Sequence, residues 1–262
     1  TVTEAGFGAD LGAEKFLDIK CRMTGIAPDA VVLVATARAL KMNGGVAKTD
    51  LNEENLEALA AGMPNLLQHV ANLTEVYGMP VVVAINRHPT DTVAELELIQ
   101  SCCAERGVNA VLSEVWAKGG QGGIALAQEV LRLVEQPSEL KFAYPTGASI
   151  KEAVEAVATR IYHADGVDFA PAALKQIAAL EENGYGHLPV CIAKTQYSFS
   201  DDPVKLGAPR GFRIAVREVK VSAGAGFVVV LAGSVMTMPG LPKVPAAEKI
   251  DVDESGRITG LF

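Results

Sequence analysis

The pattern of apolar and polar positions predicts an α/β fold. Four short runs rich in Val and Ile predict buried strands, and they cover residues 30–36, 80–86, 109–115 and 190–195. These runs carry few charges and do not alternate strictly, which is typical of parallel strands covered on both faces. Two later runs, 212–221 and 227–232, predict a hairpin or a close pair of strands around the small residues 222–226.

Helical spacing of apolar residues fills the segments between these strands. Residues 11–23, 92–106 and 123–135 predict helices that end near Gly25, at Gly107 and before Pro137. Residues 53–77 are also helical in pattern, but Gly62 and Pro64 lie inside. They predict two helices, of which the second begins near Pro64. The alternation of strands and helices predicts a right-handed, mostly parallel sheet with helices on both faces.

The pattern of predicted elements changes after about residue 137. Residues 149–163 and 170–182 predict two more helices, and residues 236–244 form an irregular segment rich in Pro and Gly. We therefore expect residues 1–137 to belong to the main α/β ligand-binding domain. Residues 138–262 are expected to form a smaller α/β subdomain.

Composition narrows the class of protein. The chain has 262 residues, 49% of them apolar, and a formal net charge of −8. This composition predicts a folded globular protein and argues against nucleic-acid binding, which needs a basic face. The longest apolar runs are too short to cross a membrane.

Cysteine usage and the first residue bear on the cellular context. Four cysteines without a CxxC pair indicate neither a disulfide framework nor a structural zinc, so we expect a cytoplasmic protein. The chain begins at Thr1, without Met and inside a glycine-rich motif, which suggests a fragment or a processed half.

The first candidate motif is the glycine-rich segment 4–12 (EAGFGADLG), which leads into the first predicted helix. Gly6, Gly8 and Gly12 allow backbone amides to approach an anion, and a helix N-terminus favours negative charge. The spacing is not GxGxxG, and no strand precedes it within the chain. A tight turn with close helix packing explains the glycines equally well.

Three further motifs follow the first three predicted strands. Ligands of open α/β sheets bind at the carboxyl ends of the strands. In segment 35–45, Arg38, Lys41 and Asn43 are candidates for holding a phosphate or a purine. The alternative is a basic loop on a solvated surface.

The other two strand-end motifs carry a titratable ring and an indole. His88 lies in segment 86–92, where Asp91 is a candidate acceptor for the ring N–H, although Thr90 or Asp91 can equally cap the next helix. Trp116 is the only Trp and lies in the glycine-rich segment 114–123, where it suits stacking on a flat heterocycle. A partly buried packing role is the alternative for Trp116.

Several catalytic motifs are absent from the sequence. It contains no GxxxxGK[ST] phosphate loop, no HExxH, no GxSxG, and no His, Cys or carboxylate cluster with metal-ligand spacing. We therefore expect neither a self-sufficient nucleophile nor a metal centre in these 262 residues.

The longer motifs together resemble one family. Segments 3–16 (TEAGFGADLGAEKF), 34–45, 86–92, 194–203 (KTQYSFSDDP), 222–227 and 236–251 (MTMPGLPKVPAAEKID) are similar to the C-terminal half of formate–tetrahydrofolate ligase. The resemblance runs from Thr1 to Phe262. It implies a P-loop-NTPase-like core whose phosphate loop lies in an N-terminal half. It also implies the conversion of ATP, formate and tetrahydrofolate to 10-formyltetrahydrofolate, ADP and phosphate through formyl phosphate.

The resemblance also implies roles for individual residues. Gly6, Phe7 and Gly8 would form a wall of the formyl phosphate region. The nucleotide side would be lined by Arg38, Lys41 and Asn43, and the pterin side by His88, Pro89, Leu112 and Trp116. Where the family often has Phe before the Pro, this chain has His88, and an imidazole offers less area for stacking. ATP with Mg²⁺, and a monovalent cation, are the further groups that the resemblance implies.

The expected partner follows from the same resemblance. It is the N-terminal half of the enzyme, within a homo-oligomer that is typically a tetramer in bacteria, and the chain alone is expected to be inactive. Two alternatives remain at this point. One is a non-catalytic module for folate or nucleotide binding or for oligomerisation. The other is a ParA-like nucleotide-binding domain, against which the missing phosphate loop counts.

Overall fold

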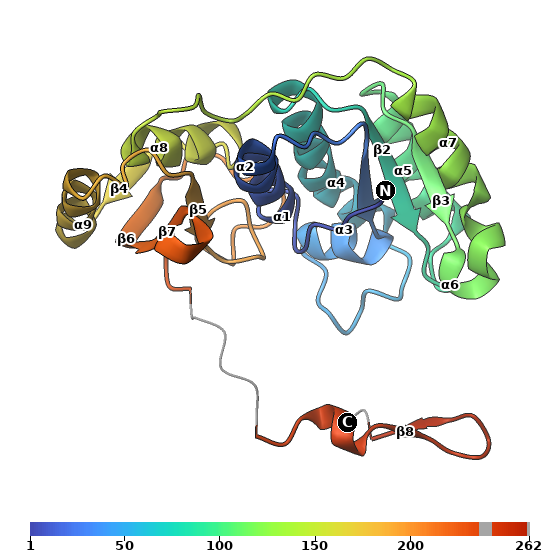
Figure 1. The fold of residues 1–262 in the computed structure, drawn as a ribbon. Helices are drawn as coiled ribbons and strands as arrows, with labels where there is room; N and C mark the ends of the chain where they lie inside the picture. The colour runs from blue at the N-terminus through green and yellow to red at the C-terminus, as the bar shows by residue number, and fades with distance from the viewer. Residues whose placement is uncertain (236–242, 261–262) are drawn as a thin grey trace.

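The computed structural model describes residues 1–235 and 243–260, and Figure 1 shows its course. Residues 236–242 of the predicted irregular segment 236–244 lie outside the described part. The strands are β1 (Val31–Ala35), β2 (Val81–Asn86), β3 (Ala110–Ser113), β4 (Val167–Phe169), β5 (Val190–Ala193), β6 (Ile214–Ser222), β7 (Phe227–Ala232), β8 (Asp251–Val252) and β9 (Ile258–Thr259).

Helical segments connect these strands. Before residue 140 they are α1 (Gly12–Lys15), the π-helical η1 (Phe16–Cys21), α2 (Arg22–Thr24), α3 (Ala37–Asn43), α4 (Leu56–Ala71), the π-helical η2 (Asn72–Val76), α5 (Val93–Ala104), α6 (Val115–Lys118), the 3-10 turn η3 (Gly119–Gly123) and α7 (Ile124–Val134). After it they are α8 (Ile150–Arg160), α9 (Pro171–Glu182) and the 3-10 turns η4 (Ala223–Ala225) and η5 (Ala246–Lys249).

The first sheet is fully parallel, in the order β1-β2-β3. On one face, residues such as Leu33 and Val83 join a core cluster with Leu66 and Val70 of α4. On the other face, α7 contacts β2 and β3. The central strand β2 is therefore buried from Val81 to Ile85, as its uninterrupted apolar sequence predicts.

The edge strand β1 departs from the prediction that the strands are covered on both faces. Val32 and Val34 face the α7 side of the sheet, opposite Val82 and Ala84 of β2. Val32 is 41% exposed and Val34 is 63% exposed, whereas Val82 and Ala84 are buried. Among the described residues α7 contacts β2 and β3, and this face of β1 is left exposed.

The second sheet is mixed, in the order β4-β6-β7-β5. β6 and β7 form the predicted antiparallel pair around η4, while β4 lies parallel to β6 and β5 parallel to β7. Figure 1 shows α8 and α9 on this part of the molecule. The fold class is thus α/β, with helices around a parallel sheet and a mixed sheet.

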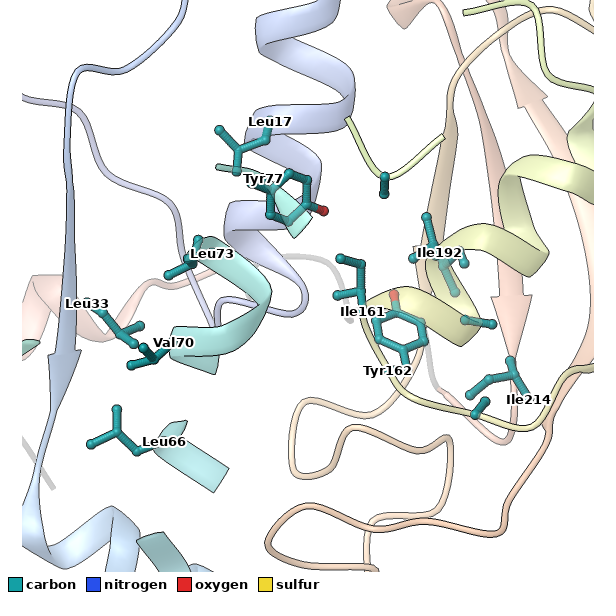
Figure 2. Close-up of a cluster of buried hydrophobic side chains, with 14 of the residues drawn as sticks. Leu17, Leu33, Leu66, Val70, Leu73, Tyr77, Ile161, Tyr162, Ile192 and Ile214 are labelled. Atoms are coloured by element: carbon teal, nitrogen blue, oxygen red, sulfur yellow. The ribbon is translucent and has the colours of Figure 1, made fainter. Parts of the chain in front are cut away.

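One hydrophobic cluster joins the two sheets. It includes Leu33 from the first sheet, Ile192 and Ile214 from the second, and the buried Tyr77 and Tyr162 between them. Figure 2 shows Leu33 on the side of the first sheet, Ile192 and Ile214 on the side of the second, and Tyr77 and Tyr162 between them. Residue 137 falls in the connection between α7 and α8. The two-domain division at that residue stays a prediction.

Helix α4 corrects the prediction of two helices. It runs unbroken from Leu56 to Ala71 and contains Pro64. Gly62 serves close packing rather than helix termination, since a Cβ there would lie 1.9 Å from the Leu40 carbonyl oxygen of α3. Leu59, Met63, Leu66 and Val70 bury one face of the helix, and this burial outweighs the hydrogen bond that a proline removes.

Candidate functional site

The carboxyl ends of the three parallel strands lie at one edge of the first sheet. β1 leads through Thr36 into α3, β2 leads into Arg87 and His88, and β3 leads into Glu114 and α6. The last paired residues of β2 and β3 are Asn86 and Ser113. The segments that follow the strands are therefore neighbours in space, as predicted for a ligand site at this edge.

His88 is held by both neighbouring segments. An Arg38 guanidinium N–H approaches His88 Nε2 at 3.3 Å, and His88 Nδ1 lies 2.9 Å from Thr90 Oγ1. Arginine can only donate, so Nε2 accepts and the ring hydrogen is on Nδ1, which donates to Thr90. Asp91 accepts a hydrogen bond from the His88 backbone N–H at 2.7 Å, not from its ring. The structure thus brings Arg38 and His88 together.

Trp116 presents a large free surface beside this histidine loop. Its side chain is 60% exposed, so the packing alternative does not describe it. The indole Nε1–H nevertheless donates to the Arg87 backbone carbonyl at 2.8 Å. The ring is therefore anchored at its polar edge while it remains accessible to solvent, which suits stacking on a flat heterocycle.

Arg87 and Glu114 connect the loops after β2 and β3, and neither was predicted as a site residue. Arg87 donates to Glu114 Oε1 at 2.9 Å, and Lys118 donates to Glu114 Oε2 at 2.6 Å. The hydrogen bonds and charges of Lys118 and Arg87 hold the pKa of Glu114 below its ordinary value. The register of β2 against β3 accounts for this pairing, since Arg87 and Glu114 directly follow the paired residues Asn86 and Ser113.

Lys41 does not lie at the strand-end surface. Its side chain is 1% exposed, and its ammonium forms an ion pair with Glu95 at 2.8 Å and donates to the Glu53 carbonyl at 2.8 Å. The charge of Lys41 and two of its three N–H donors are therefore engaged within the chain, and its contact with a nucleotide stays a prediction. A helical face pattern alone did not reveal that Lys41 points inward.

Asn43 and Leu112 have structural contacts. Asn43 Oδ1 accepts a hydrogen bond from Gly207 N–H at 3.1 Å, and Asn65 donates to the Gly207 carbonyl at 2.8 Å, so Asn43 holds the loop between β5 and β6 against α3. Leu112 is partly buried against the hydrophobic core. Pro89 is exposed in the turn that leads to α5.

The opening glycines are placed beside α4. A Cβ on Gly8 would meet Asp10 Oδ1 at 2.5 Å and His69 Cε1 at 3.6 Å, and a Cβ on Gly12 would lie 1.8 Å from the Gly6 carbonyl oxygen. The Gly8 carbonyl accepts hydrogen bonds from the N–H groups of Leu11 and Gly12 at 3.0 Å and 2.9 Å. Two amides at this helix start are therefore engaged by the chain itself.

Phe7 is the exposed element of this segment. It is 81% exposed and has a φ of 59°, which places it in the left-handed region that non-glycine residues rarely adopt. Backbone strain of this kind concentrates at functional sites. The contacts given above for Gly6, Gly8 and Gly12 are to one another, to Asp10, to Leu11 and to His69.

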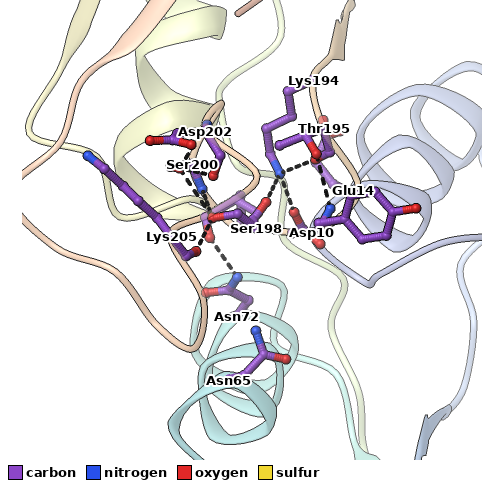
Figure 3. Close-up of polar contacts among 12 residues, drawn as sticks. Asp10, Glu14, Asn65, Asn72, Lys194, Thr195, Ser198, Ser200, Asp202 and Lys205 are labelled. Carbon is purple, nitrogen blue, oxygen red and sulfur yellow. Dashed lines mark hydrogen bonds and ion pairs between the residues drawn. The ribbon is translucent and has the colours of Figure 1, made fainter. Parts of the chain in front are cut away.

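A buried ion pair anchors this segment to the loop that follows β5. Lys194 contacts Asp10 at 2.8 Å and also donates to the carbonyls of Thr195 and Ser198, as Figure 3 shows. The Lys194 side chain is fully buried. Burial lowers the pKa of Lys194, and Asp10 partly offsets this effect.

Glu14 is a second buried charge in the same region. Its side chain has no exposed area, Oε2 contacts Lys15 at 3.1 Å, and Oε1 has no hydrogen-bond partner among the described residues. Burial, only partly offset by Lys15, raises the pKa of Glu14 to about 7. An uncompensated carboxylate in such a place is costly, which favours the protonated form.

The described part of the chain comprises residues 1–235 and 243–260. Within these ranges, no three His, Cys, Asp or Glu side chains converge as metal ligands. The cysteines Cys21, Cys102, Cys103 and Cys191 are free thiols. No helix in the same ranges combines the length and the apolar composition that crossing a bilayer requires.

Comparison with known proteins assigns the family. The sequence model of the family "Formate--tetrahydrofolate ligase" matches residues 1–262. A protein of Symbiobacterium thermophilum named "Formate--tetrahydrofolate ligase" is 62% identical over 261 residues. The alignment covers 100% of this chain and 47% of that relative, so the chain spans about half the relative's length. The chain belongs to the formate–tetrahydrofolate ligase family.

Proposed function

We propose that this chain supplies the folate wall and part of the nucleotide wall of an ATP-dependent ligase that joins formate to tetrahydrofolate. The observation that carries the proposal is the strand-end cluster, in which an exposed indole is anchored to the loop that also carries an imidazole. Trp116 is anchored through Arg87, and the adjacent His88 is held by Arg38. The family to which the chain belongs supports the reaction.

The reaction has two steps. A formate oxygen attacks the γ-phosphorus of ATP, which breaks the bond to ADP and forms formyl phosphate. N10 of tetrahydrofolate then attacks the formyl carbon, phosphate leaves, and N10 loses its proton. Formate becomes an electrophile only once it has a leaving group, so the protein's task is chiefly positioning and charge stabilisation.

The chain's own residues bind and orient in this scheme. Trp116 stacks on the pterin, His88 and Pro89 border the same surface, and Leu112 supports it from the core. The Arg38 guanidinium faces the nucleotide side. Lys41 and Asn43 act indirectly, because they fix α3 to α5 and to the loop at Gly207.

The opening segment belongs to the formyl phosphate region in this proposal. Gly6, Phe7 and Gly8 form its wall, with the strained, exposed Phe7 as the contacting side chain. The buried pair of Asp10 and Lys194 holds the segment in place. The contacts of Gly8 and Gly12 place this segment beside α4.

The remaining wall comes from polypeptide outside these 262 residues, which we propose is an N-terminal half. The chain covers 47% of its relative. β1 pairs only with β2 among the described strands, and Val32 and Val34 leave an apolar strip beside that free edge. Parallel sheets are normally covered on both faces, so this edge suits a further strand and its helix.

The groups that accompany the reaction are assigned to the assembled enzyme. We propose that Mg²⁺ is held by the phosphates of ATP and by the N-terminal half, which also carries the phosphate loop, and that a monovalent cation binds in the assembly. A cytoplasmic location is consistent with the free thiols. The assembled enzyme is proposed to be a homo-oligomer.

Reconstitution tests this function. The chain is mixed with the remaining portion of the Symbiobacterium relative, and ADP release is measured with ATP, formate and tetrahydrofolate present. We expect ADP release that requires all three substrates and both polypeptides. Folded, associated polypeptides that release no ADP would contradict the proposal and favour a non-catalytic binding module.

A further inference from the structure

We propose that Arg87 and Glu114 are positioning residues that fix the orientation of the Trp116 indole before any ligand binds. The inference deepens the proposed function, and the part of its test that uses tetrahydrofolate rests on that proposed function. The inference concerns how the exposed indole ring is held. It gives a positioning role to Arg87 and Glu114, for which the sequence motifs predicted none.

The indole has a single polar anchor, and that anchor is a backbone atom of the neighbouring loop. Trp116 Nε1–H donates to the Arg87 carbonyl at 2.8 Å, although the side chain is 60% exposed. An exposed indole without such a bond would sample several rotamers at little cost. The position of the ring therefore depends on where the Arg87 backbone lies.

The Arg87 backbone is fixed from two sides. Its N–H donates to the Ser113 carbonyl at 3.2 Å, which extends the pairing of β2 with β3 by one bond. Its guanidinium contacts Glu114 Oε1 at 2.9 Å. Arg87 is thus tied by main chain and side chain to the same segment that carries Trp116.

Glu114 is the centre of this arrangement. Its Oε1 binds Arg87, its Oε2 binds Lys118 at 2.6 Å, and its N–H donates to the Gly122 carbonyl at 3.1 Å. Its carbonyl accepts from Ala117 and Lys118, which closes the turn of α6. A Cβ at Gly122 would lie 2.4 Å from the Glu114 carbonyl oxygen, so the loop is tightly closed.

The consequence is a preorganised stacking surface. The loop after β2 receives the indole N–H, and the loop after β3 supplies both the indole and the carboxylate that holds Arg87. The two loops therefore move together, and the ring face is presented without an ordering cost at the time of binding. Loss of such preorganisation weakens binding by about three- to tenfold.

The test uses the fluorescence of Trp116, the only Trp of the chain. Steady-state anisotropy is measured without ligand for the unchanged chain and for Arg87→Met, Arg87→Lys and Lys118→Met, with circular dichroism as a check of folding. We expect anisotropy to fall in Arg87→Met, to recover in part in Arg87→Lys, and to change less in Lys118→Met. Unchanged anisotropy in folded Arg87→Met, or an equal fall in Lys118→Met, would overturn the inference.

A second variant covers a failure of Arg87→Met to fold. Glu114→Gln keeps the shape of the side chain and removes its charge, and we expect the same fall in anisotropy. Titration with tetrahydrofolate then separates the two proposals. Weaker binding by about three- to tenfold in the Arg87 and Glu114 variants supports both. If the unchanged chain does not bind tetrahydrofolate, the proposed folate wall fails, and the ligand-free anisotropy still decides the inference.

Discussion

Lys41 and Glu95 form an ion pair of 2.8 Å between α3 and α5, and both side chains are buried. Burial alone would raise the pKa of Glu95, but hydrogen bonds from Lys41, Thr92 and Asn55 outweigh it and hold that pKa below its ordinary value. We predict that Lys41→Met lowers the free energy of unfolding by about 3–5 kcal/mol, because it leaves a buried carboxylate without its partner. Urea denaturation measures this loss.

Arg38 is the matched comparison within the same helix. Its side chain is only partly buried, and its guanidinium contacts His88. We predict that Arg38→Met changes the free energy of unfolding by less than about 1 kcal/mol. In the assembled enzyme it should instead weaken nucleotide binding. Equal stability losses in the two variants would contradict the division between a structural Lys41 and a functional Arg38.

The buried Lys194 gives a second stability prediction. Lys194→Met leaves Asp10 without its cation and two carbonyls without a donor. We expect a loss of about 3–5 kcal/mol in the free energy of unfolding. Lys220→Met, at an exposed position of β6, serves as the control and should change stability by less than about 0.5 kcal/mol. An equally small effect for Lys194→Met would show that the pair is not needed to hold the opening segment.

Glu14 predicts a pH dependence of stability. Its pKa is about 7 in the folded chain against an ordinary value of 4.5. Between these values the folded state holds a proton that the unfolded state releases, so this group's contribution is full below about pH 4.5 and is lost as pH rises to 7. The loss is on the order of 3 kcal/mol.

The comparison variant is Glu14→Gln, which mimics the protonated side chain. Urea denaturation at pH 5 and pH 8 should show that Glu14→Gln gains stability relative to the unchanged chain as pH rises. Glu155→Gln, at an exposed position, should show no such gain. If the difference between Glu14→Gln and the unchanged chain were the same at both pH values, Glu14 would not titrate in this range.

The exposed strip on β1 predicts a selective defect in assembly. Val34 is 63% exposed, so Val34→Lys should change the free energy of unfolding of this chain by less than about 0.5 kcal/mol. It should weaken association with the remaining half by at least about tenfold, because a lysine would be buried at the joined sheet face. Leu131→Lys on α7, where Leu131 is 65% exposed, is the control. Equal association of both variants would contradict docking at β1.

Much of the fold could be predicted from the sequence because the strands are short, apolar and rich in Val and Ile. The positions of β1, β2, β3 and β5 agree with the predicted runs to within one or two residues. Gly62 and Pro64 misled the prediction of α4, because glycine marks either a helix end or a close contact between helices, and proline is common at a helix start but here lies inside the helix. Only the tertiary structure shows that Gly62 packs against Leu40.

The candidate site was predictable only in part. That His88 and Trp116 follow neighbouring strands is visible in the sequence, and the structure connects them through Arg87. The sequence did not show that the Lys41 side chain points into the interior, because a short helix with few charges does not reveal which of its faces packs against α5. The pairing of Arg87 with Glu114 follows from strand register, which depends on contacts distant in sequence.

The folate-binding role proposed for Trp116 can be measured directly. The unchanged chain is titrated with tetrahydrofolate, and fluorescence is corrected for absorption with free N-acetyltryptophanamide. We predict saturable quenching of Trp116 fluorescence, together with loss of tetrahydrofolate binding by calorimetry in Trp116→Ala. Absence of saturable quenching, with equal calorimetric titrations for both proteins, would contradict the claim that this strand-end surface is the folate wall.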